Sequence, residues 1–385
     1  MVLQIQLVEK KVIPVYIEFP ESTMHKAVHD ALYETARVAL VYLLGCDAKA
    51  VVENYFKFVA LVLRIRQSCC HAALIPAAER AASIEMLDNL RAMSSSSSTE
   101  ALRMVQQAIT EHLIEELRQT IVGDDDKNCV MCDEYLVDEK MVTIGGCEHV
   151  YCGPCFEQIQ SQICTKCRVP FLEDDVKQAK AGAIQVKSNG KPNATKALGR
   201  SPKLQAMLSL IKQMEKDEKA VIFSQWTSFL DVIEREFIKL GYTYTRIDGS
   251  MNMEERCDAM DRFETEGTES KREPRFILCS LMACGTGINL TRGNVVFMCD
   301  TWWNSAAENQ AMDRVHRLGQ TRPVRVYRLL MKDTVEARMV DIQVAKETLG
   351  KGTIERLDAE EKKRARLTTL KDLFAVSNIR ETWID

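Results

Sequence analysis

The sequence predicts an α/β chain: a doubly wound parallel sheet in the C-terminal half, a cysteine-rich module inserted before it, and a helical N-terminal region. Two observations support this fold class. From residue 203 onward, short β-branched or aromatic runs alternate with amphipathic segments at helical spacing. Before them, seven of the 14 cysteines fall between residues 129 and 167. The order of the parts is therefore helical region, cysteine module, sheet.

Length and composition limit what the chain can be. The 385 residues include 51 Lys and Arg against 55 Asp and Glu, and 46% are apolar, which is typical of folded globular proteins. At roughly 100 to 200 residues per domain, two or three domains are expected. The net charge of -4 excludes nucleic-acid binding through a global positive excess, so such binding needs a local patch. The longest apolar run, residues 38–44, is too short for a membrane span, and no membrane partner is predicted.

The N-terminal region, residues 1–122, is predicted to be helical after one strand at Val12–Ile17. A helix capped at Ser22 follows, and apolar residues then recur at helical spacing through 47–71 and 79–122. This spacing indicates a packed core.

Cys69, Cys70 and His71 are adjacent in sequence and are of residue types that bind metal ions. Adjacent cysteines lack the spacing of a Cys-x-x-Cys turn, so burial in the core is favoured over metal binding.

The cysteine module, residues 127–172, has the spacing of paired metal ligands. The candidate ligands are Cys129, Cys132, Cys147, His149, Cys152, Cys155, Cys164 and Cys167. Because a Cys-x-x-Cys turn lets two thiolates reach one tetrahedral ion, eight ligands predict two structural zinc ions. A disulfide framework is the alternative, but it leaves His149 unexplained. Since each ion already has four protein ligands, zinc hydrolysis is not expected.

The order of these ligands resembles a RING finger. The resemblance implies two cross-braced sites, one formed by Cys129, Cys132, Cys152 and Cys155 and the other by Cys147, His149, Cys164 and Cys167. It also implies ubiquitin-ligase activity with a ubiquitin-conjugating enzyme and ubiquitin as partners. Val130 and Pro170 are then expected in the docking groove, and Arg168 against the ubiquitin thioester. The alternative is a zinc module that only organises its neighbours or binds a protein.

Residues 173–201 are polar and poorly periodic, and they are predicted to form a linker. Residues 202–350 are predicted to form the sheet, and 351–385 a helical tail. The expected strands are Ala220–Ser224, Tyr242–Ile247, Phe276–Ser280, Val295–Cys299 and Val324–Leu330. Ligands of doubly wound sheets bind at the carboxyl ends of the strands, so a functional site is expected there.

Arg314 and Arg317 are predicted to lie one helical turn apart. Two guanidinium groups on one face of a helix suit the transferring group of a polyphosphate. The alternative is a solvated basic helix end.

A series of motifs decides between these alternatives: FSQWTSF (223–229), RIDGSM (246–251), ILCSLMACGTGINL (277–290), DTWWN (300–304) and QAMDRVHRLGQ (310–320). Their order and spacing resemble motifs four to six of the SWI/SNF-type ATPases, two-lobed motors that move along duplex DNA. The segments IRQSCCH (65–71) and LTTLKDLF (367–374) resemble the subgroup that has a RING finger between the lobes. The resemblance implies that 202–350 is the second RecA-like helicase lobe, of the P-loop-NTPase type, and that 1–122 is the end of the first lobe and a helical inter-lobe region.

The same resemblance assigns roles to single residues. Arg314 and Arg317 become arginine fingers for ATP, which the complete motor binds with magnesium. The expected nucleotide contacts are Gly285, Gly287 and Gln310. The expected DNA contacts are Ser224, Gln225, Arg246, Ser280 and Thr286. Double-stranded DNA, chromatin and replication or repair proteins are the implied partners, and the nucleus is the implied location.

No segment of the sequence has the P-loop spacing G-x-x-x-x-G-K-[ST], which positions a lysine and backbone N–H groups around the phosphates. The sequence therefore predicts that this chain alone does not hydrolyse ATP and that hydrolysis requires a first lobe with a P-loop. The alternative function is a non-catalytic zinc-binding interaction module from a truncated gene.

Overall fold

The computed structural model describes residues 7–46, 51, 54–94, 106–114, 141–144, 150–152, 156, 176–178, 198–264, 273–283, 288–349 and 359–376. The chain divides into two compact units, residues 116–192 and the remainder on either side of them. Within the described ranges, no helix is both long enough and apolar enough to cross a bilayer.

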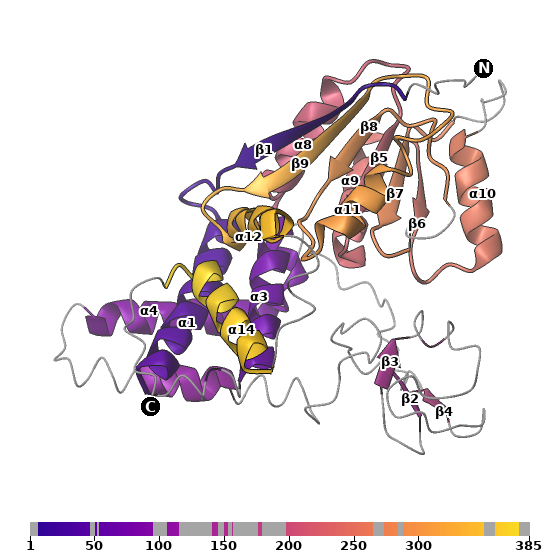
Figure 1. Ribbon diagram of the computed structural model, residues 1–385. Helices are drawn as coiled ribbons and strands as arrows, with labels where there is room; N and C mark the ends of the chain where they lie inside the picture. The colour runs from indigo at the N-terminus through magenta and orange to yellow at the C-terminus, as the bar shows by residue number, and fades with distance from the viewer. Residues whose placement is uncertain are drawn as a thin grey trace. The chain divides into compact units, whose positions relative to one another are not determined.

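A six-stranded sheet forms the centre of the larger unit (Figure 1). All of its strand pairings are parallel, and the strand order is β1-β9-β8-β5-β7-β6. The strands are β1 (Lys10–Ile17), β5 (Ala220–Ser224), β6 (Tyr244–Ile247), β7 (Phe276–Ser280), β8 (Val295–Met298) and β9 (Val324–Met331). Every residue of β5, β7 and β8 is buried, as expected for strands covered on both faces. The predicted doubly wound sheet is confirmed.

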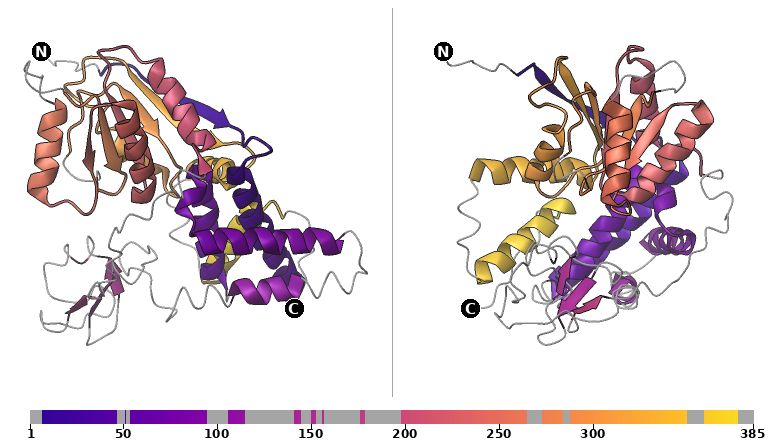
Figure 2. Two further views of the ribbon diagram at one scale, coloured as in Figure 1. Left: turned by 180° about the vertical axis from the view of Figure 1, so that it is seen from behind. Right: turned by 90° about the vertical axis from the view of Figure 1, so that its right-hand side faces the viewer.

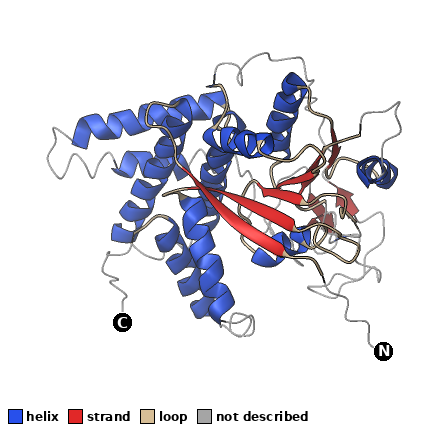
Figure 3. Cartoon of the chain, turned by 90° about the horizontal axis from the view of Figure 1, so that it is seen from above, coloured by secondary structure: helices blue, strands red, loops and turns tan. Residues whose placement is uncertain are grey.

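Helices cover both faces of this sheet (Figure 3). They are α8 (Pro202–Lys212), α9 (Thr227–Leu240), α10 (Met253–Glu264), α11 (Ser305–Met312) and α12 (Val335–Leu349). Local sequence sets their ends. Ser201 Oγ accepts a hydrogen bond from the Leu204 N–H at the start of α8, with Pro202 in the first turn. Gly241 ends α9 in the left-handed region, at φ +70°.

Strand β1 comes from the N-terminal region but belongs to the same sheet as the C-terminal strands. It pairs with β9 from Lys10 opposite Val324 to Ile17 opposite Met331, and it forms one edge of the sheet. The sequence placed this segment at the end of the first lobe. The strand itself was predicted, but its partner was not, because more than 300 residues separate the two strands in the chain.

Helices α1 (Met24–Cys46), α3 (Tyr55–Cys70) and α4 (Ala77–Ser94) follow β1, with a short 3-10 turn, η1 (Ala72–Leu74), between the last two. Figure 2 shows α4 lying across α1. Helix α14 (Ala359–Leu373) joins this group, since the ring of Phe374 contacts those of Tyr33 and Phe58. Cys69, Cys70 and His71 are buried as predicted.

The smaller unit contains a three-stranded sheet in the order β3-β2-β4. Its antiparallel strands are β2 (Met141–Ile144), β3 (Val150–Cys152) and β4 (Val176–Gln178). The sequence predicts that residues 176–178 belong to the linker, but they pair with β2 as an edge strand of this sheet.

A buried ion pair links the start of α8 to the start of α12. Lys203 Nζ lies 2.6 and 2.7 Å from the two carboxylate oxygens of Glu336, and both side chains are fully buried. Burial alone lowers the pKa of Lys203, but the Glu336 carboxylate outweighs it, so the net pKa is raised. Lys203 therefore keeps its positive charge at neutral pH.

We expect Glu336→Gln to lower the free energy of unfolding by about 3 to 5 kcal/mol, because it leaves Lys203 as a buried charge without its counter-ion. Adding Lys203→Met should recover most of this loss, since an apolar side chain then fills the same space. Urea denaturation of the two variants measures both effects. A double variant no more stable than Glu336→Gln would contradict the explanation.

Candidate functional site

The carboxyl ends of β5 and β8 meet at the buried carboxylate of Asp300. Ser224 Oγ donates to one oxygen of Asp300, and the Gln225 N–H lies 3.1 and 3.2 Å from the two oxygens. The Trp226 N–H in turn donates to Ser224 Oγ at 3.1 Å. Burial raises the pKa of Asp300, and the hydrogen bonds from Ser224 and Gln225 oppose that shift. Asp300 thus fixes the FSQW turn after β5.

Arg66 reaches this place from helix α3. Its guanidinium donates to the carbonyl oxygen of Thr301 and lies against the rings of Trp226 and Trp303, 5.7 and 5.5 Å from their centroids. Only 1% of Arg66 is exposed. In the sequence, Arg66 stands within the segment IRQSCCH (65–71), and no motif gives it a role. One feature of the sequence does indicate a special role: Arg66 is a charged side chain on the helical face that carries Val62, Ile65 and Cys69.

A second buried carboxylate, that of Glu308 in α11, holds the DTWWN loop. It accepts from the Trp302 N–H at 2.7 Å and from Arg328 Nη2 at 2.6 Å. Gln343 of α12 donates to the Trp302 carbonyl oxygen. Burial raises the pKa of Glu308, while Arg328 opposes the shift. Both loops at the carboxyl edge of the sheet are therefore held by buried acidic side chains.

Arg314 and Arg317 do not share a helix. Helix α11 ends at Met312, Asp313 is its C-cap, and residues 313–319 form successive turns. The prediction that both arginines leave one helical face is therefore wrong. Arg314 is half-buried and its carbonyl oxygen accepts from the Leu290 N–H, whereas Arg317 is exposed.

Contacts from two other elements hold this arginine turn (residues 313–319). His316 Nε2 lies 2.7 Å from the Val8 carbonyl oxygen, and Lys10 Nζ lies 3.0 Å from Asp313. The buried Gln320 amide donates to the carbonyl oxygens of Gly293 and Val315. The turn thus rests on the beginning of β1 on one side and on the loop before β8 on the other.

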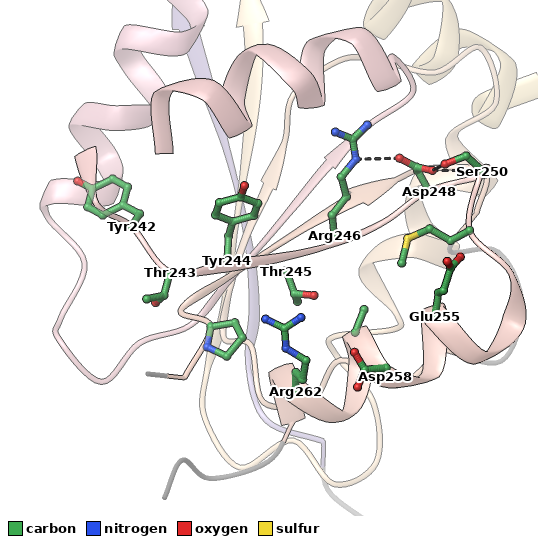
Figure 4. A pocket seen from close by; sticks show the side chains of 13 residues that line it. Tyr242, Thr243, Tyr244, Thr245, Arg246, Asp248, Ser250, Glu255, Asp258 and Arg262 are labelled. Carbon is green, nitrogen blue, oxygen red and sulfur yellow. Dashed lines mark hydrogen bonds and ion pairs between the residues drawn. The ribbon is translucent and has the colours of Figure 1, made fainter. Parts of the chain in front are cut away.

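Arg246, a predicted DNA contact, lies beside an open groove of about 950 Å³ along β6 and α10 (Figure 4). Its guanidinium contacts three carboxylates, at 2.7 Å from Asp248, 2.7 Å from Asp231 and 2.9 Å from Glu234. Asp248 also accepts from the backbone and hydroxyl of Ser250. Arg246 therefore shapes the RIDGS turn through contacts within the chain.

The remaining predicted residues divide into described and undescribed positions. Ser280 is buried at the end of β7, and Gln310 is exposed on α11. Gly285, Thr286 and Gly287 lie outside the described residues, as do Val130, Arg168 and Pro170. Of the eight predicted zinc ligands, only Cys152 is in a described segment, at the end of β3. Among described residues, no group of three or more His, Cys, Asp or Glu is placed to hold a metal ion.

The described motif residues use their side chains in different ways. Ser224 and Arg246 make hydrogen bonds within the chain, whereas the side chain of Arg317 is exposed to solvent. An exposed guanidinium suits the binding of an anion such as a phosphate.

Known proteins resemble this chain in sequence and in fold. Residues 202–319 match the family model of the helicase conserved C-terminal domain. The DNA repair protein RAD5B of Arabidopsis thaliana is 32% identical over 362 residues, which cover 93% of this chain and 27% of that protein. Helicase-like transcription factor of Mus musculus is 31% identical over 343 residues, 84% of this chain and 31% of that protein. The crystal structure of the C-terminal part of the Fun30 ATPase domain has the same fold, with a TM-score of 0.50 at 21% identity, and the match covers 95% of this chain and 99% of that one.

The sheet, its motifs and the matched family model define a helicase C-terminal domain with the RecA-like fold of a second helicase lobe. Within that class the chain is homologous to RAD5-type repair proteins and helicase-like transcription factor, to which it is 31 to 32% identical. It spans about a third of the length of the curated relatives that it matches.

We expect Asp300→Asn to lower the free energy of unfolding by about 2 to 3 kcal/mol, because the substitution replaces one buried acceptor oxygen with an NH2 group and removes the negative charge that interacts most strongly with Arg66. Guanidinium denaturation followed by circular dichroism measures the loss. Asp313→Asn is the matched control, since that side chain is 59% exposed and its loss should have little effect. Equal effects of the two substitutions would refute the role of Asp300.

Proposed function

We propose that this chain is the DNA-engaging half of an ATP-dependent double-stranded-DNA translocase with a role in DNA repair. The observation that carries the proposal is the arginine turn, which the segment before β1 and the loop before β8 hold in place in a RecA-like second lobe, with Arg317 exposed to solvent. Homologues named as DNA repair proteins support the repair role. A nuclear location and contacts with chromatin or replication and repair proteins follow from the same homology.

The chemistry proposed for this half is electrostatic. ATP with magnesium, held by a first lobe, supplies the phosphoryl group and the energy of its hydrolysis. The role of Arg314 and Arg317 is to place positive charge beside the transferring phosphate. The role of Gln310, Gly285 and Gly287 is to line the nucleotide side of the cleft between the lobes. A guanidinium suits this task because it donates several hydrogen bonds in a fixed plane.

Contacts to duplex DNA are proposed for the loops at the carboxyl edge of the sheet. Gln225, Ser280 and Thr286 offer short polar side chains, which suit phosphate contacts that do not depend on base sequence. Ser224 and Arg246 have their hydrogen bonds inside the chain, so we propose that they shape these loops. Movement of the loops with the nucleotide state would then couple hydrolysis to translocation.

We expect negligible ATP hydrolysis by this chain alone, and DNA-stimulated hydrolysis when it is joined to the first lobe of a RAD5-type relative. In the joined protein, Arg317→Ala should lower turnover by at least ~100-fold while leaving DNA affinity nearly unchanged, because the arginine acts on the transition state. A coupled phosphate-release assay measures turnover.

Arg322→Ala is the matched control for that experiment. Arg322 lies five residues further along, and its guanidinium pairs with Asp217, so turnover should stay near that of the parent. Substantial hydrolysis by the isolated chain, or a mild effect of Arg317→Ala, would contradict the proposal.

We also propose that residues 127–172 form a RING-type ubiquitin ligase with two zinc ions. The supporting observation is the ligand spacing, since seven thiolates and one imidazole are the donors that zinc favours. In the proposed cross-brace, Cys129, Cys132, Cys152 and Cys155 hold one ion, and Cys147, His149, Cys164 and Cys167 the other. The ions supply folding energy, while Val130 and Pro170 would contact the conjugating enzyme. The competing proposal is a zinc module that only binds proteins.

We expect Arg168→Ala to slow discharge of ubiquitin from a conjugating enzyme without weakening its binding, because a contact with the thioester tail acts mainly in the transition state. Single-turnover discharge assays across a panel of conjugating enzymes, with binding measured separately, test this. Zinc analysis is the control for folding and should give two ions per chain, with Cys147→Ser lowering that number. If no enzyme in the panel is accelerated by the parent chain, the ligase proposal fails.

A further inference from the structure

Arg66 contacts two functional loops at once, from a helix that belongs to neither. Its side chain lies between the Trp226 ring, which follows β5, and the Trp303 ring, which follows β8. Its Nη2 donates to the Thr301 carbonyl oxygen. The same oxygen is 3.5 Å from the side-chain amide of Gln225, so Arg66 and Gln225 share an acceptor.

The surroundings of Arg66 lower the stability of the folded chain. Within the described part of the chain, Arg66 Nε and Nη1, Trp226 Nε1 and Thr301 Oγ1 are buried without a hydrogen-bond partner. Buried donors without partners cost free energy, and an apolar side chain of similar length would fill the space at lower cost. What arginine adds is a cation close to two indole rings and one directed hydrogen bond.

We propose that Arg66 is a positioning residue for DNA translocation: it fixes the separation of the Trp226 and Thr301–Trp303 loops and links both to helix α3. The inference rests on the proposed function, because both loops belong to motifs assigned to that motor. Arg66 acts through Thr301, whose carbonyl oxygen orients Gln225, a proposed DNA contact. A shift of α3 would therefore move both loops together.

Amide hydrogen exchange in this chain tests whether Arg66 holds the two loops in place. In Arg66→Met, peptides that cover 223–229 and 299–304 should exchange at least ~10-fold faster, while the melting temperature stays within a few degrees of the parent. Arg66→Lys keeps the positive charge but lacks the planar guanidinium, so the exchange rates of both peptides should be intermediate. Arg64→Met is the matched control on the same helix, because Arg64 pairs with Glu79 instead, and it should leave both loops unchanged.

Unchanged exchange in both Arg66 variants would overturn the proposal. If Arg66→Met fails to fold, Arg66→Lys supplies the comparison.

The coupling part is tested in the protein joined to a first lobe. Arg66→Met should reduce the displacement of a DNA triplex per ATP hydrolysed by at least ~5-fold and should spare hydrolysis without DNA. If Arg66→Met leaves the displacement of the triplex per ATP unchanged, Arg66 only stabilises the structure, and its proposed role in translocation is wrong. If the parent shows no DNA-stimulated hydrolysis, the proposed function fails and the translocation role falls with it, whereas the exchange experiment still decides whether Arg66 holds the loops.

Discussion

The carboxylate of Asp300 is the contact on which the functional edge depends. It accepts hydrogen bonds from Ser224 and Gln225, and it lies close enough to Arg66 to offset part of the cost of burying that charge. Because the group is buried, its interactions act in a low-dielectric setting and are stronger than they would be at the surface. One side chain at the end of β8 thereby joins the loop after β5, the loop after β8 and helix α3.

Three distant parts of the chain converge on this lobe. Strand β1 completes one edge of the sheet and contacts the arginine turn, α3 delivers Arg66, and the segment at 199–203 is anchored by the carbonyl of Gly199 to His71 and by Lys203 to Glu336. The helical region is therefore part of the machinery of the second lobe. This arrangement offers a route by which a movement of α3 reaches the strand ends.

The motif residues serve two physical purposes. Ser224, Arg246 and Asp248 make their hydrogen bonds inside the chain and give the loops their shape. Arg317 has an exposed side chain, which a ligand can reach from solvent. A motif thus combines residues that hold a loop with residues that the loop presents, and burial separates the two.

Sequence by itself determined the strands β5 to β9, their doubly wound class, the order of the motifs and the paired spacing of the cysteines. These features depend on local periodicity and on the geometry of short turns, which neighbouring residues specify. Only the tertiary structure decided that β1 pairs with β9, that Arg314 and Arg317 lie in turns beyond the end of α11, and that Arg66 lies between two tryptophans. Each of these depends on contacts between residues far apart in the chain, or on a helix ending where tertiary contacts replace its hydrogen bonds, and no local pattern encodes such contacts.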